Sequence, residues 1–454
     1  MTDMTGIALV AAYALFIAAT ALPVVRSKGS AAAFFVNRRS SGTWAVALSI
    51  IVSCVGASAT LGVIGKAFSI GMPAFWWLGS GAVGMSLLAL FLARKVRESG
   101  AYTMPELVEK HLGKESRPLI SLLIVIAWIA ILAAQFAALE RILHSLTGLD
   151  AGYCLALGFG LIVMHSMGGQ AVIMRLDRLQ SVLLLAGLVT VLAWLWGHNP
   201  AWTERFRPEF LNAAFGPREL VYYLFVVGGN YLVCPMLFGR LLSADDAATA
   251  RRGGLFAAAG LAICSLIIVA TGLACIGLLP AETHPDAVFT AIADGLLPGW
   301  LRLVLLLTLV SAVVSSADTC LLTASTVLSY DLLRRSDALT CRGAVAGLGL
   351  AGLLLSTTDK TILGFLCMAY DVYVSGVVVP VFIGMVAGRK AFVRSGYACC
   401  AVICGGALGA VAAISEVGAY SYAGMATAAL FTLAGLKARE VSGSTAPAPE
   451  SNVA

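Results

Sequence analysis

The chain has 454 residues, of which 59% are hydrophobic and only 12% are charged, and its mean hydropathy is +0.91. Soluble domains carry about 25% charged residues, so this composition excludes a soluble globular protein and indicates one that crosses a membrane many times. The net charge of +6 does not indicate a nucleic-acid partner, because the basic residues gather in alternate loops between the hydrophobic runs.

Hydrophobic runs of about 20 residues recur from one end of the chain to the other, and each is long enough to cross a membrane as a helix. We therefore expect an all-α polytopic membrane protein with about 13 transmembrane helices. They are predicted near residues 7–25, 44–67, 74–93, 118–145, 152–167, 177–197, 218–239, 254–279, 300–328, 343–356, 361–387, 397–415 and 419–436.

The loops that hold most of the lysines and arginines, Arg240 among them, are predicted to face the cytoplasm. An odd number of crossings then places the N-terminus outside and the C-terminus inside the cell membrane. The first helix is expected to be retained rather than cleaved as a signal peptide, because positive charges follow it instead of preceding it. Residues 438–454, which are small and polar, are predicted to form a disordered cytoplasmic tail.

Two of the predicted helices are interrupted. Residues 53–65, "SCVGASATLGVIG", place glycines in the middle of the second helix, and residues 228–239, "GGNYLVCPMLFG", place Gly-Gly-Asn and a proline inside the seventh. Within a helix, glycine costs about 1 kcal/mol and proline about 3 kcal/mol relative to alanine. Carbonyls freed by a break need partners, because lipid offers none, and a bound ion or polar solute can supply them. The alternative is that these small residues only allow helices to pack closely.

The two breaks occupy corresponding places in the chain, which is typical of inverted-repeat transporters. In these proteins a five-plus-five, LeuT-like core holds substrate and ion at a pair of broken helices. On this plan residues 44–197 form the first repeat and residues 218–387 the second. Residues 1–43 add an N-terminal helix and a cytoplasmic loop, and residues 388–437 add two peripheral helices.

A row of hydroxyl groups marks the predicted helix at 300–328. Helical periodicity places one set of residues on a single face, with Asp318 on its flank: Ala312, Ser315, Ser316, Thr319, Thr323 and Thr326. Hydroxyl oxygens suit a hard cation such as Na⁺. For Thr323, Ser325 and Thr326 we favour the alternative, a hydrogen bond to the carbonyl four residues earlier. Asp318 is harder to explain in this way, because ionisable residues at membrane depth usually face a cavity or a partner.

No enzyme activity is expected, because the sequence lacks the motifs of nucleotide-binding loops, zinc proteases and serine hydrolases. The eleven cysteines include no C-x-x-C pair, and most lie inside predicted helices. They are interpreted as small packing residues rather than as disulfide partners or metal ligands.

Five stretches, in order along residues 35–395, resemble the sodium/solute symporter family, which includes sodium/proline and sodium/glucose cotransporters. They are "GASATLGVIGKAFSIG" for the first core helix, "AYTMPELVEKHLG" for a cytoplasmic segment, "MGGQAVIMRLDRLQ" for a family signature, "AVVSSADTCLLTASTVLSYDLL" for the eighth core helix and "PVFIGMVAGRKAFVRSGYA" for the end of the tenth. The third stretch departs from the family pattern at Leu176, where threonine is usual.

The resemblance implies a Na⁺ site built from the broken first core helix and the eighth. Its ligands would be the carbonyls of Ala57, Thr60 and Ala312 and the hydroxyls of Ser315 and Ser316. The resemblance also implies that Asp177 lies along the inner path of sodium, where Asp318 and Thr319 are further candidates. Alternatively, Asp177 is a loop acid that pairs with Arg175 or Arg178.

The solute is expected to lie beside the same two breaks. The resemblance places an aromatic residue and a proline around it, and with residues of neighbouring helices the candidates are Tyr231, Pro235, Val227, Asn230, Gln135 and Tyr370. Val227 and Ala59 differ from the residues of the proline carriers, and Cys234 stands where some family members have glutamine. These departures argue against proline and leave the solute open.

Lys66 lies about 9 Å of helix rise beyond Thr60, on the outward side. One interpretation is a lysine that reaches the outer membrane interface with its charged end. The other is a cationic anchor for a carboxylate-bearing solute.

Together these features predict a secondary active transporter that couples Na⁺ entry to the uptake of a small organic solute by alternating access. Its expected partners are the solute and the lipid bilayer, without nucleic acid, and it is expected to be a monomer. One alternative is coupling to protons through Asp318 or Asp177. Another is a sensor that keeps the fold without transporting, although the short stretch after the last predicted helix counts against an attached signalling domain.

Overall fold

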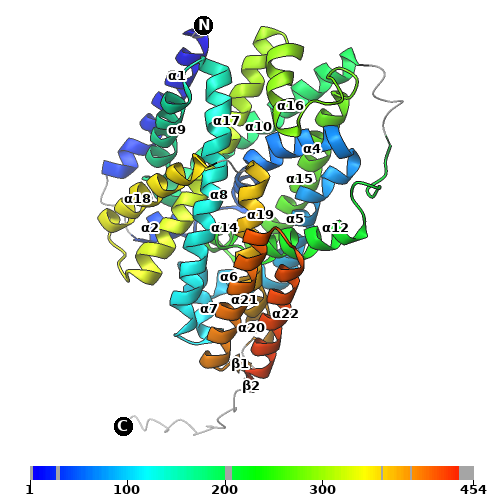
Figure 1. Ribbon diagram of the computed structural model, residues 1–454. Coiled ribbons are helices and arrows are strands. Elements are labelled where there is room, and N and C mark those ends of the chain that lie inside the picture. Colours follow the sequence, from blue (N-terminus) through cyan, green and yellow to red (C-terminus); the bar gives the residue numbers. More distant parts are fainter. Residues whose placement is uncertain (1–3, 27–30, 200–206, 359–360, 389–390, 439–454) are drawn as a thin grey trace, which may run out of the picture.

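The computed structural model describes residues 4–26, 31–199, 207–358, 361–388 and 391–438, and the predicted tail at 438–454 lies, apart from Ala438, outside this part of the chain. The described chain forms a bundle of helices with a small antiparallel sheet at one end (Figure 1). The first half holds α1 (Met4–Arg26), α2 (Ala31–Val36), α3 (Thr43–Cys54), α4 (Val63–Ile70), α5 (Trp76–Leu87), α6 (Ala93–Glu98), α7 (Met104–Leu112), α8 (Ser116–Thr147), α9 (Ala151–Ser166) and α10 (Gly169–His198).

The second half holds α12 (Pro217–Tyr222), α13 (Gly228–Leu232), α14 (Pro235–Leu242), α15 (Ala247–Ala274), α16 (Pro285–Ala291), α17 (Gly299–Thr326), α18 (Ala338–Ser356), α19 (Ile362–Tyr373), α20 (Val379–Ala387), α21 (Ser395–Ser415) and α22 (Ala419–Ala434), with strands β1 (Ala391–Val393) and β2 (Leu436–Ala438). Short 3-10 segments are η1 (Asn37–Arg39) and η3 (Met72–Phe75). Wider π-helical turns are η2 (Ser58–Gly62), η4 (Leu88–Leu92), η5 (Tyr223–Val227), η6 (Ile292–Leu296), η7 (Val327–Leu332) and η8 (Val374–Val378).

Helices lie at all thirteen places where the sequence predicts a span. Nine helices of the described chain are long and apolar enough to cross a membrane, and the bent pair 43–54 and 58–70 would be a tenth. The helices at 4–20 and 151–166 are apolar but shorter, so the count of thirteen crossings stays a prediction. The short helix at 287–296 was not expected from the sequence.

α8 and α17 lie at the centre of the bundle. α17 packs against α8, α10 and α3, and α8 also packs against α19 and α18. Nearly every residue of α17 from Leu305 to Leu322 is buried. A helix that is apolar around most of its surface is typical of the interior of a membrane protein. The hydroxyl row of α17 therefore lies inside the bundle.

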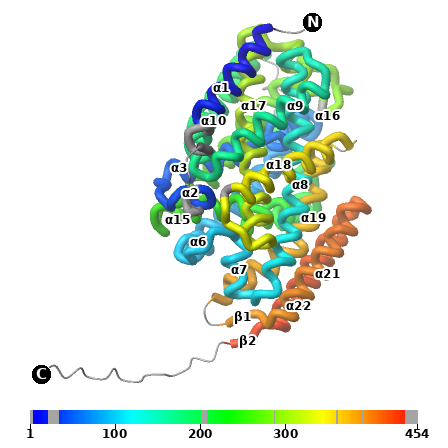
Figure 2. The backbone as a smooth tube through the Cα atoms, turned by 90° about the vertical axis from the view of Figure 1, so that its left-hand side faces the viewer, coloured from blue at the N-terminus to red at the C-terminus, as the bar shows by residue number. Residues whose placement is uncertain are grey.

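α21 and α22 pack against each other and lie along one side of the bundle (Figure 2). α21 contacts α19, and α20 contacts α22. The strands β1 and β2 pair in antiparallel register, Phe392 opposite Lys437, and join the start of this helix pair to its end.

Contacts between arginines and backbone carbonyls fasten the helix ends near α6, α7 and α14. Arg97 donates to the carbonyls of Ala244 (2.5 Å) and Asp245 (2.7 Å). In the following turn, the Asp246 carboxylate accepts the backbone N–H of Thr249 at 2.6 Å and caps α15. This hydrogen bond holds the pKa of Asp246 below its usual value.

Candidate ion and solute site

The first broken helix is α3–η2–α4, and its two arms meet at 63°. α3 ends at Cys54, and Val55 leaves the helical conformation with φ −91° and ψ 59°. A continuous α-helix would return the backbone N–H of Ala57 to the carbonyl of Ser53. Instead, Ala57 donates to Oε1 of Gln135 on α8 at 3.1 Å, so the carbonyl of Ser53 is available to another partner.

That partner is Ser316 on α17. Its hydroxyl donates to the carbonyl of Ser53 at 2.9 Å, and the carbonyl of Val52 lies 3.5 Å away. A Cβ placed on Gly56 would lie 2.3 Å from the Ser316 Oγ, so only glycine at the break allows this approach. The freed end of α3 and the hydroxyl row of α17 therefore meet directly.

The neighbouring hydroxyl, Ser315, turns toward α10. It donates to Oδ1 of Asp177 at 2.7 Å, and Asp177 Oδ2 accepts from the hydroxyl of Ser49 on α3. Asp177 is fully buried. It is neither a loop acid nor paired with Arg175 or Arg178: its basic partner is Arg240, with Nη2 3.3 Å from Oδ2.

Arg240 is a residue near the candidate site that the sequence analysis placed wrongly. It was assigned to a cytoplasmic loop, but it lies on α14 and is 1% exposed. Its guanidinium donates to five groups on α3, α10 and α17: Ser49 Oγ (3.0 Å), Gln170 Oε1 (3.1 Å), Ser53 Oγ (3.1 Å), Thr319 Oγ1 (2.5 Å) and Asp177 Oδ2. The sequence did contain a signal for the buried position of Arg240, because an ionisable residue inside an apolar helix after a break usually faces a partner or a cavity.

Asp318, on the flank of the hydroxyl row, faces α9. One of its carboxylate oxygens contacts Nδ1 of His165, and both side chains are fully buried. Thr319 lies between this pair and the arginine, because its hydroxyl is 3.1 Å from Oδ1 of Asp318 and accepts from Nη2 of Arg240. Ser325 donates to the carbonyl of Leu321 in its own helix at 2.6 Å, as the alternative interpretation expected.

Ala57 and Thr60, expected to offer their carbonyls to Na⁺, lie beyond the break. The Thr60 hydroxyl donates to the carbonyl of Gly56 (2.8 Å), and the Thr60 carbonyl accepts the backbone N–H of Val63. The carbonyls that contact Ser316 are those of Val52 and Ser53.

The second broken helix is α13–α14. α13 ends at Leu232, Val233 is non-helical with φ −130° and ψ 82°, and Cys234 is extended. Pro235 then starts α14, where its missing N–H costs no hydrogen bond. The carbonyl of Val233, freed by the break, accepts from Tyr373 Oη at 2.7 Å. Pro235 is therefore placed as a helix start, and it lines a small cavity of about 30 Å³ beside Arg240 and Gln170.

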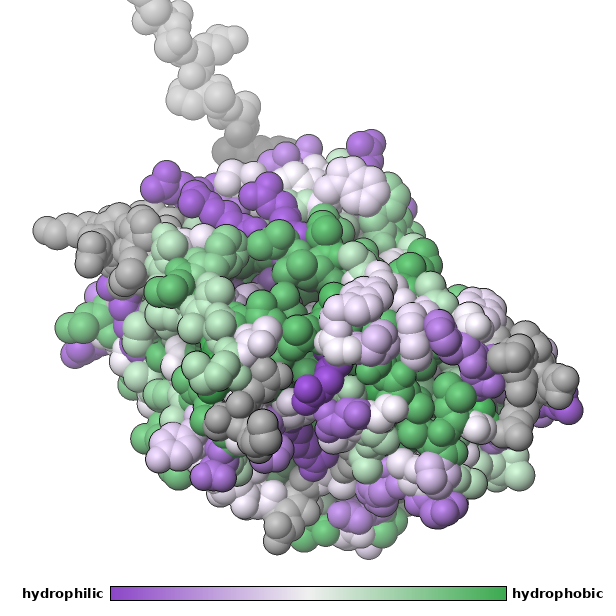
Figure 3. Space-filling model, turned by 90° about the horizontal axis from the view of Figure 1, so that it is seen from above, coloured by the Kyte–Doolittle hydropathy of each residue, from purple (hydrophilic) through white to green (hydrophobic). Residues whose placement is uncertain are grey.

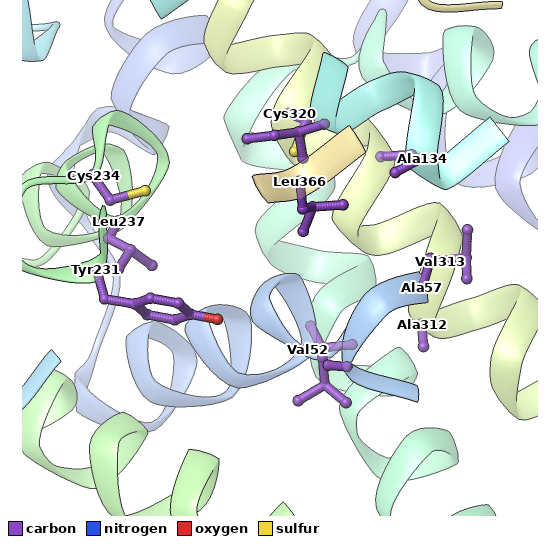
Figure 4. Close-up of a cluster of buried hydrophobic side chains, with 14 of the residues drawn as sticks. Val52, Ala57, Ala134, Tyr231, Cys234, Leu237, Ala312, Val313, Cys320 and Leu366 are labelled. Atoms are coloured by element: carbon purple, nitrogen blue, oxygen red, sulfur yellow. The ribbon is translucent and has the colours of Figure 1, made fainter. Parts of the chain in front are cut away.

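A central cavity lies between the two breaks and α17. It brings together four of the predicted solute residues, Gln135, Asn230, Tyr231 and Tyr370, with Ser316. Figure 4 shows side chains around this region, with Tyr231, Cys234 and Leu237 from the second break and Ala57 and Ala312 from the first break and α17. The cavity volume is about 40 Å³, which holds a water molecule or an ion but no organic solute. This conformation is closed around the site.

Besides Pro235, two predicted solute residues lie outside the central cavity. Val227 is buried at the end of η5. Lys66 lines a second, larger cavity of about 790 Å³, where its Nζ donates to Tyr223 Oη and lies 4.9 Å from the centre of the Tyr223 ring.

Comparison with known proteins supports a transport site. The model of the sodium:solute symporter family matches residues 34–198 and 200–338. The chain is 24% identical over 346 residues to a sodium/glucose cotransporter of Vibrio parahaemolyticus, covering 66% of this chain and 63% of the relative. It is 24% identical over 348 residues to a sodium/proline symporter of Staphylococcus aureus, covering 72% of this chain and 68% of the relative. It is 25% identical over 336 residues to a sodium/pantothenate symporter of Haemophilus influenzae, covering 68% of each chain. The match thus spans about two-thirds of each relative's length.

Solved structures share the fold along nearly the whole chain. A Na⁺-coupled sialic acid symporter in a substrate-bound, outward-open state superposes with a TM-score of 0.81 at 15% identity, covering 97% of this chain and 99% of that one. MhsT in complex with L-phenylalanine has a TM-score of 0.61 at 16% identity, covering 87% and 98%. These likenesses confirm the expected all-α, LeuT-like membrane fold.

Proposed function

Because the chain belongs to the sodium:solute symporter family, we propose that it is a secondary active transporter that couples Na⁺ entry to the uptake of a small organic solute. The observation that carries this proposal is the contact of Ser316 with the freed carbonyl of Ser53. This contact brings a broken helix and a hydroxyl-bearing helix together. Their carbonyl and hydroxyl oxygens are the ligands that a transported alkali cation needs.

The ion would lie among the hydroxyls of Ser315 and Ser316, the carbonyl of Ala312 and the carbonyls of the first break. The contacts of Ser316 favour Val52 and Ser53 over Ala57 and Thr60 as the source of those carbonyls. In this arrangement the Ser316 hydroxyl donates to the carbonyl of Ser53. A bound Na⁺ would accept both oxygens as ligands and hold α3 against α17, next to the central cavity where the solute binds.

Arg240 gives alternating access a structural basis. The small cavity beside Arg240 and Gln170 has a volume of about 30 Å³. It lies between the central cavity and the arginine-rich end of the bundle. The guanidinium joins α14 to α3, α10 and α17, so release of ion and solute toward that end requires these helices to separate. Arg240 and Asp177 together would form the inner gate, with Asp177 and Thr319 at the mouth of the ion path.

The free energy of Na⁺ entry is large enough to drive accumulation of the solute. One positive charge that moves down about 100 mV releases about 2.3 kcal/mol. A tenfold Na⁺ gradient adds about 1.4 kcal/mol, and the sum corresponds to roughly 500-fold accumulation of solute. The excess of basic residues near α6, α7 and α14 supports a cell-membrane protein with this end, and the C-terminus, inside.

The test is uptake of a solute library into proteoliposomes with and without an inward Na⁺ gradient. In Ser316→Ala, the dependence of uptake on Na⁺ is expected to be lost. Ser325→Ala is the matched control, because the Ser325 hydroxyl serves only its own helix among the described contacts. Unchanged sodium affinity in Ser316→Ala would contradict the site.

Proton coupling is the second candidate, and the buried pair of Asp318 and His165 is the observation that favours it. Asp177 supports it less, because the guanidinium of Arg240 already balances its charge. Uptake driven by a pH gradient in the absence of Na⁺, and abolished in Asp318→Asn, would decide for protons.

A further inference from the structure

A large cavity opens beside α4, away from the central site. Its volume is about 790 Å³ and it is lined by residues of α4, α12, η5, α19, α21 and α22, a size typical of pockets that bind small molecules. Seen from above in Figure 3, hydrophilic residues gather near the middle of the molecule within a hydrophobic surround. The cavity is therefore large enough for the organic solute that the central cavity excludes in this conformation.

One wall of the cavity carries a positive charge. Lys66 is half-buried, and its Nζ lies 4.9 Å from the ring centre of Tyr223 and 5.9 Å from that of Phe215. Aromatic faces stabilise a cation without neutralising it. No acidic side chain forms an ion pair with Lys66 in the part of the chain that the structure describes. An ammonium has three donors, of which one goes to Tyr223 Oη.

The part of the cavity formed by α19 carries a negative charge. Asp371 on α19 is 7% exposed, and its Oδ1 accepts from Tyr222 Oη at 2.9 Å and from Ser421 Oγ at 2.6 Å. A carboxylate has about four acceptor positions, so two hydroxyls leave capacity for a further donor. Within the described residues no basic group pairs with it. A buried acid without a cation is costly at membrane depth, and such residues usually face a ligand or pathway.

Lys66 and Asp371 do not form an ion pair with each other in the described chain, and each is held by a different tyrosine. Lys66 lies on Tyr223 and Asp371 is bound to Tyr222, and the centres of these consecutive rings are 6.2 Å apart. Cys367 lines the cavity one helical turn before Asp371. Three further charged residues, Arg218, Glu219 and Glu416, line the cavity but are exposed, where water screens their charge.

We propose that this cavity is a binding site for a zwitterionic solute of amino-acid or betaine type, whose carboxylate is bound by Lys66 and whose cationic nitrogen is bound by Asp371. The proposal rests on the transport function above and adds the charge class of the solute and a second place where it binds. Each isolated charge gains its missing counter-charge in the complex, which neither a simple acid nor a simple amine provides.

The position of the cavity fits a site that precedes the central one. Trp77 of α5 stacks on Tyr370, which lines the central cavity, with 6.3 Å between ring centres. The same indole contacts Tyr223, which lines the larger cavity, edge to face at 5.7 Å. This aromatic layer lies between the two cavities, so aromatic rings separate a solute bound by Lys66 and Asp371 from the closed central site.

The experiment compares matched triplets of ligands on the full chain in lipid nanodiscs containing sodium chloride. The probes are the standard L-amino acids and glycine betaine, each with the acid that lacks its nitrogen and the amine that lacks its carboxylate. Binding is measured by isothermal titration calorimetry. At least one zwitterion is expected to bind about tenfold or more tightly than both of its analogues, since each lost hydrogen bond to a charged group is worth that much.

Single substitutions test the contributions of Lys66 and Asp371 separately. Lys66→Met is expected to abolish the preference for the zwitterion over the amine, and Asp371→Asn the preference over the acid. Lys66→Arg, which keeps the charge, is expected to retain the preference, and its comparison with Lys66→Gln decides the matter if Lys66→Met does not fold. Glu219→Gln removes an exposed carboxylate of the same cavity and should change nothing. A preference that survives in both Lys66→Met and Asp371→Asn, or a panel in which no zwitterion binds, overturns the proposal.

Uptake of the same compounds distinguishes this site from the transport function. Na⁺-driven uptake of solutes that carry one charge or none would overturn the zwitterion site and leave symport intact. Tight zwitterion binding that depends on Lys66 and Asp371, without Na⁺-driven uptake of any compound, would uphold the site and refute symport.

Discussion

Arg240 and Asp177 are 63 residues apart in the chain, yet Nη2 of the arginine lies 3.3 Å from Oδ2 of the aspartate in the interior of the bundle. Their contact joins α14, the second arm of the second broken helix, to α10. Because the same guanidinium reaches Ser53 at the end of α3, one side chain connects both broken helices. The two breaks are thus physically linked through a buried cation.

Removal of the arginine is expected to destabilise the protein strongly. Arg240→Met leaves Asp177 buried without a counter-charge, and breaking a buried pair in this way costs about 3–5 kcal/mol. We expect a lower melting temperature of the purified protein and loss of uptake. The double variant Arg240→Met with Asp177→Asn should recover much of the melting temperature, and its failure to do so would show that the ion pair is not the main role of Arg240.

The glycine at the first break is expected to be essential for sodium binding. In Gly56→Ala the new methyl group would lie 2.3 Å from Ser316 Oγ, so Ser316 is forced away from the freed carbonyls. Losing such a ligand costs about 1–3 kcal/mol, and the Na⁺ concentration for half-maximal uptake should rise about tenfold or more. Gly160→Ala on α9 is the control, since its Cβ would meet open space and uptake should be unchanged.

A second glycine sets the spacing of α5 and α13. The Cβ of Gly84→Ala would lie 2.0 Å from the carbonyl oxygen of Gly228, and relieving such overpacking typically costs about 1–3 kcal/mol. We expect a lower melting temperature and slower uptake, because α13 carries Asn230 and Tyr231 into the central cavity. Gly239→Ala on α14, which has open space around it, is the matched control. Equal melting temperatures for the two variants would contradict this account.

The hydroxyl of Tyr373 is expected to stabilise the second break. Tyr373→Phe keeps the ring in its contact with Trp128, whose centre is 5.0 Å away, but leaves the carbonyl of Val233 without its donor. A buried carbonyl without a partner costs about 1–3 kcal/mol. Thermal denaturation should show this loss, and Tyr370→Phe measured alongside should instead change solute affinity, because Tyr370 lines the central cavity. Unaltered thermal stability in Tyr373→Phe would mean that the break needs no such cap.

The sequence by itself determined the class of fold, the position of the helices and the two breaks. Hydrophobic runs report burial in lipid whatever their neighbours are, and glycine or proline inside such a run reports an interrupted helix wherever it packs. The hydroxyl row of α17 was visible for the same local reason, because residues three and four apart share one face of a helix.

The partners of the polar groups that connect different helices were decided by the tertiary structure alone. The register between α3 and α17 selects Val52 and Ser53, rather than Ala57 and Thr60, as the carbonyls beside Ser316. The direction in which α14 leaves the second break turns Arg240 inward onto Asp177. Hydrogen bonds and ion pairs depend on distances of a few tenths of an ångström between segments remote in the chain, and no local pattern of residues contains those distances.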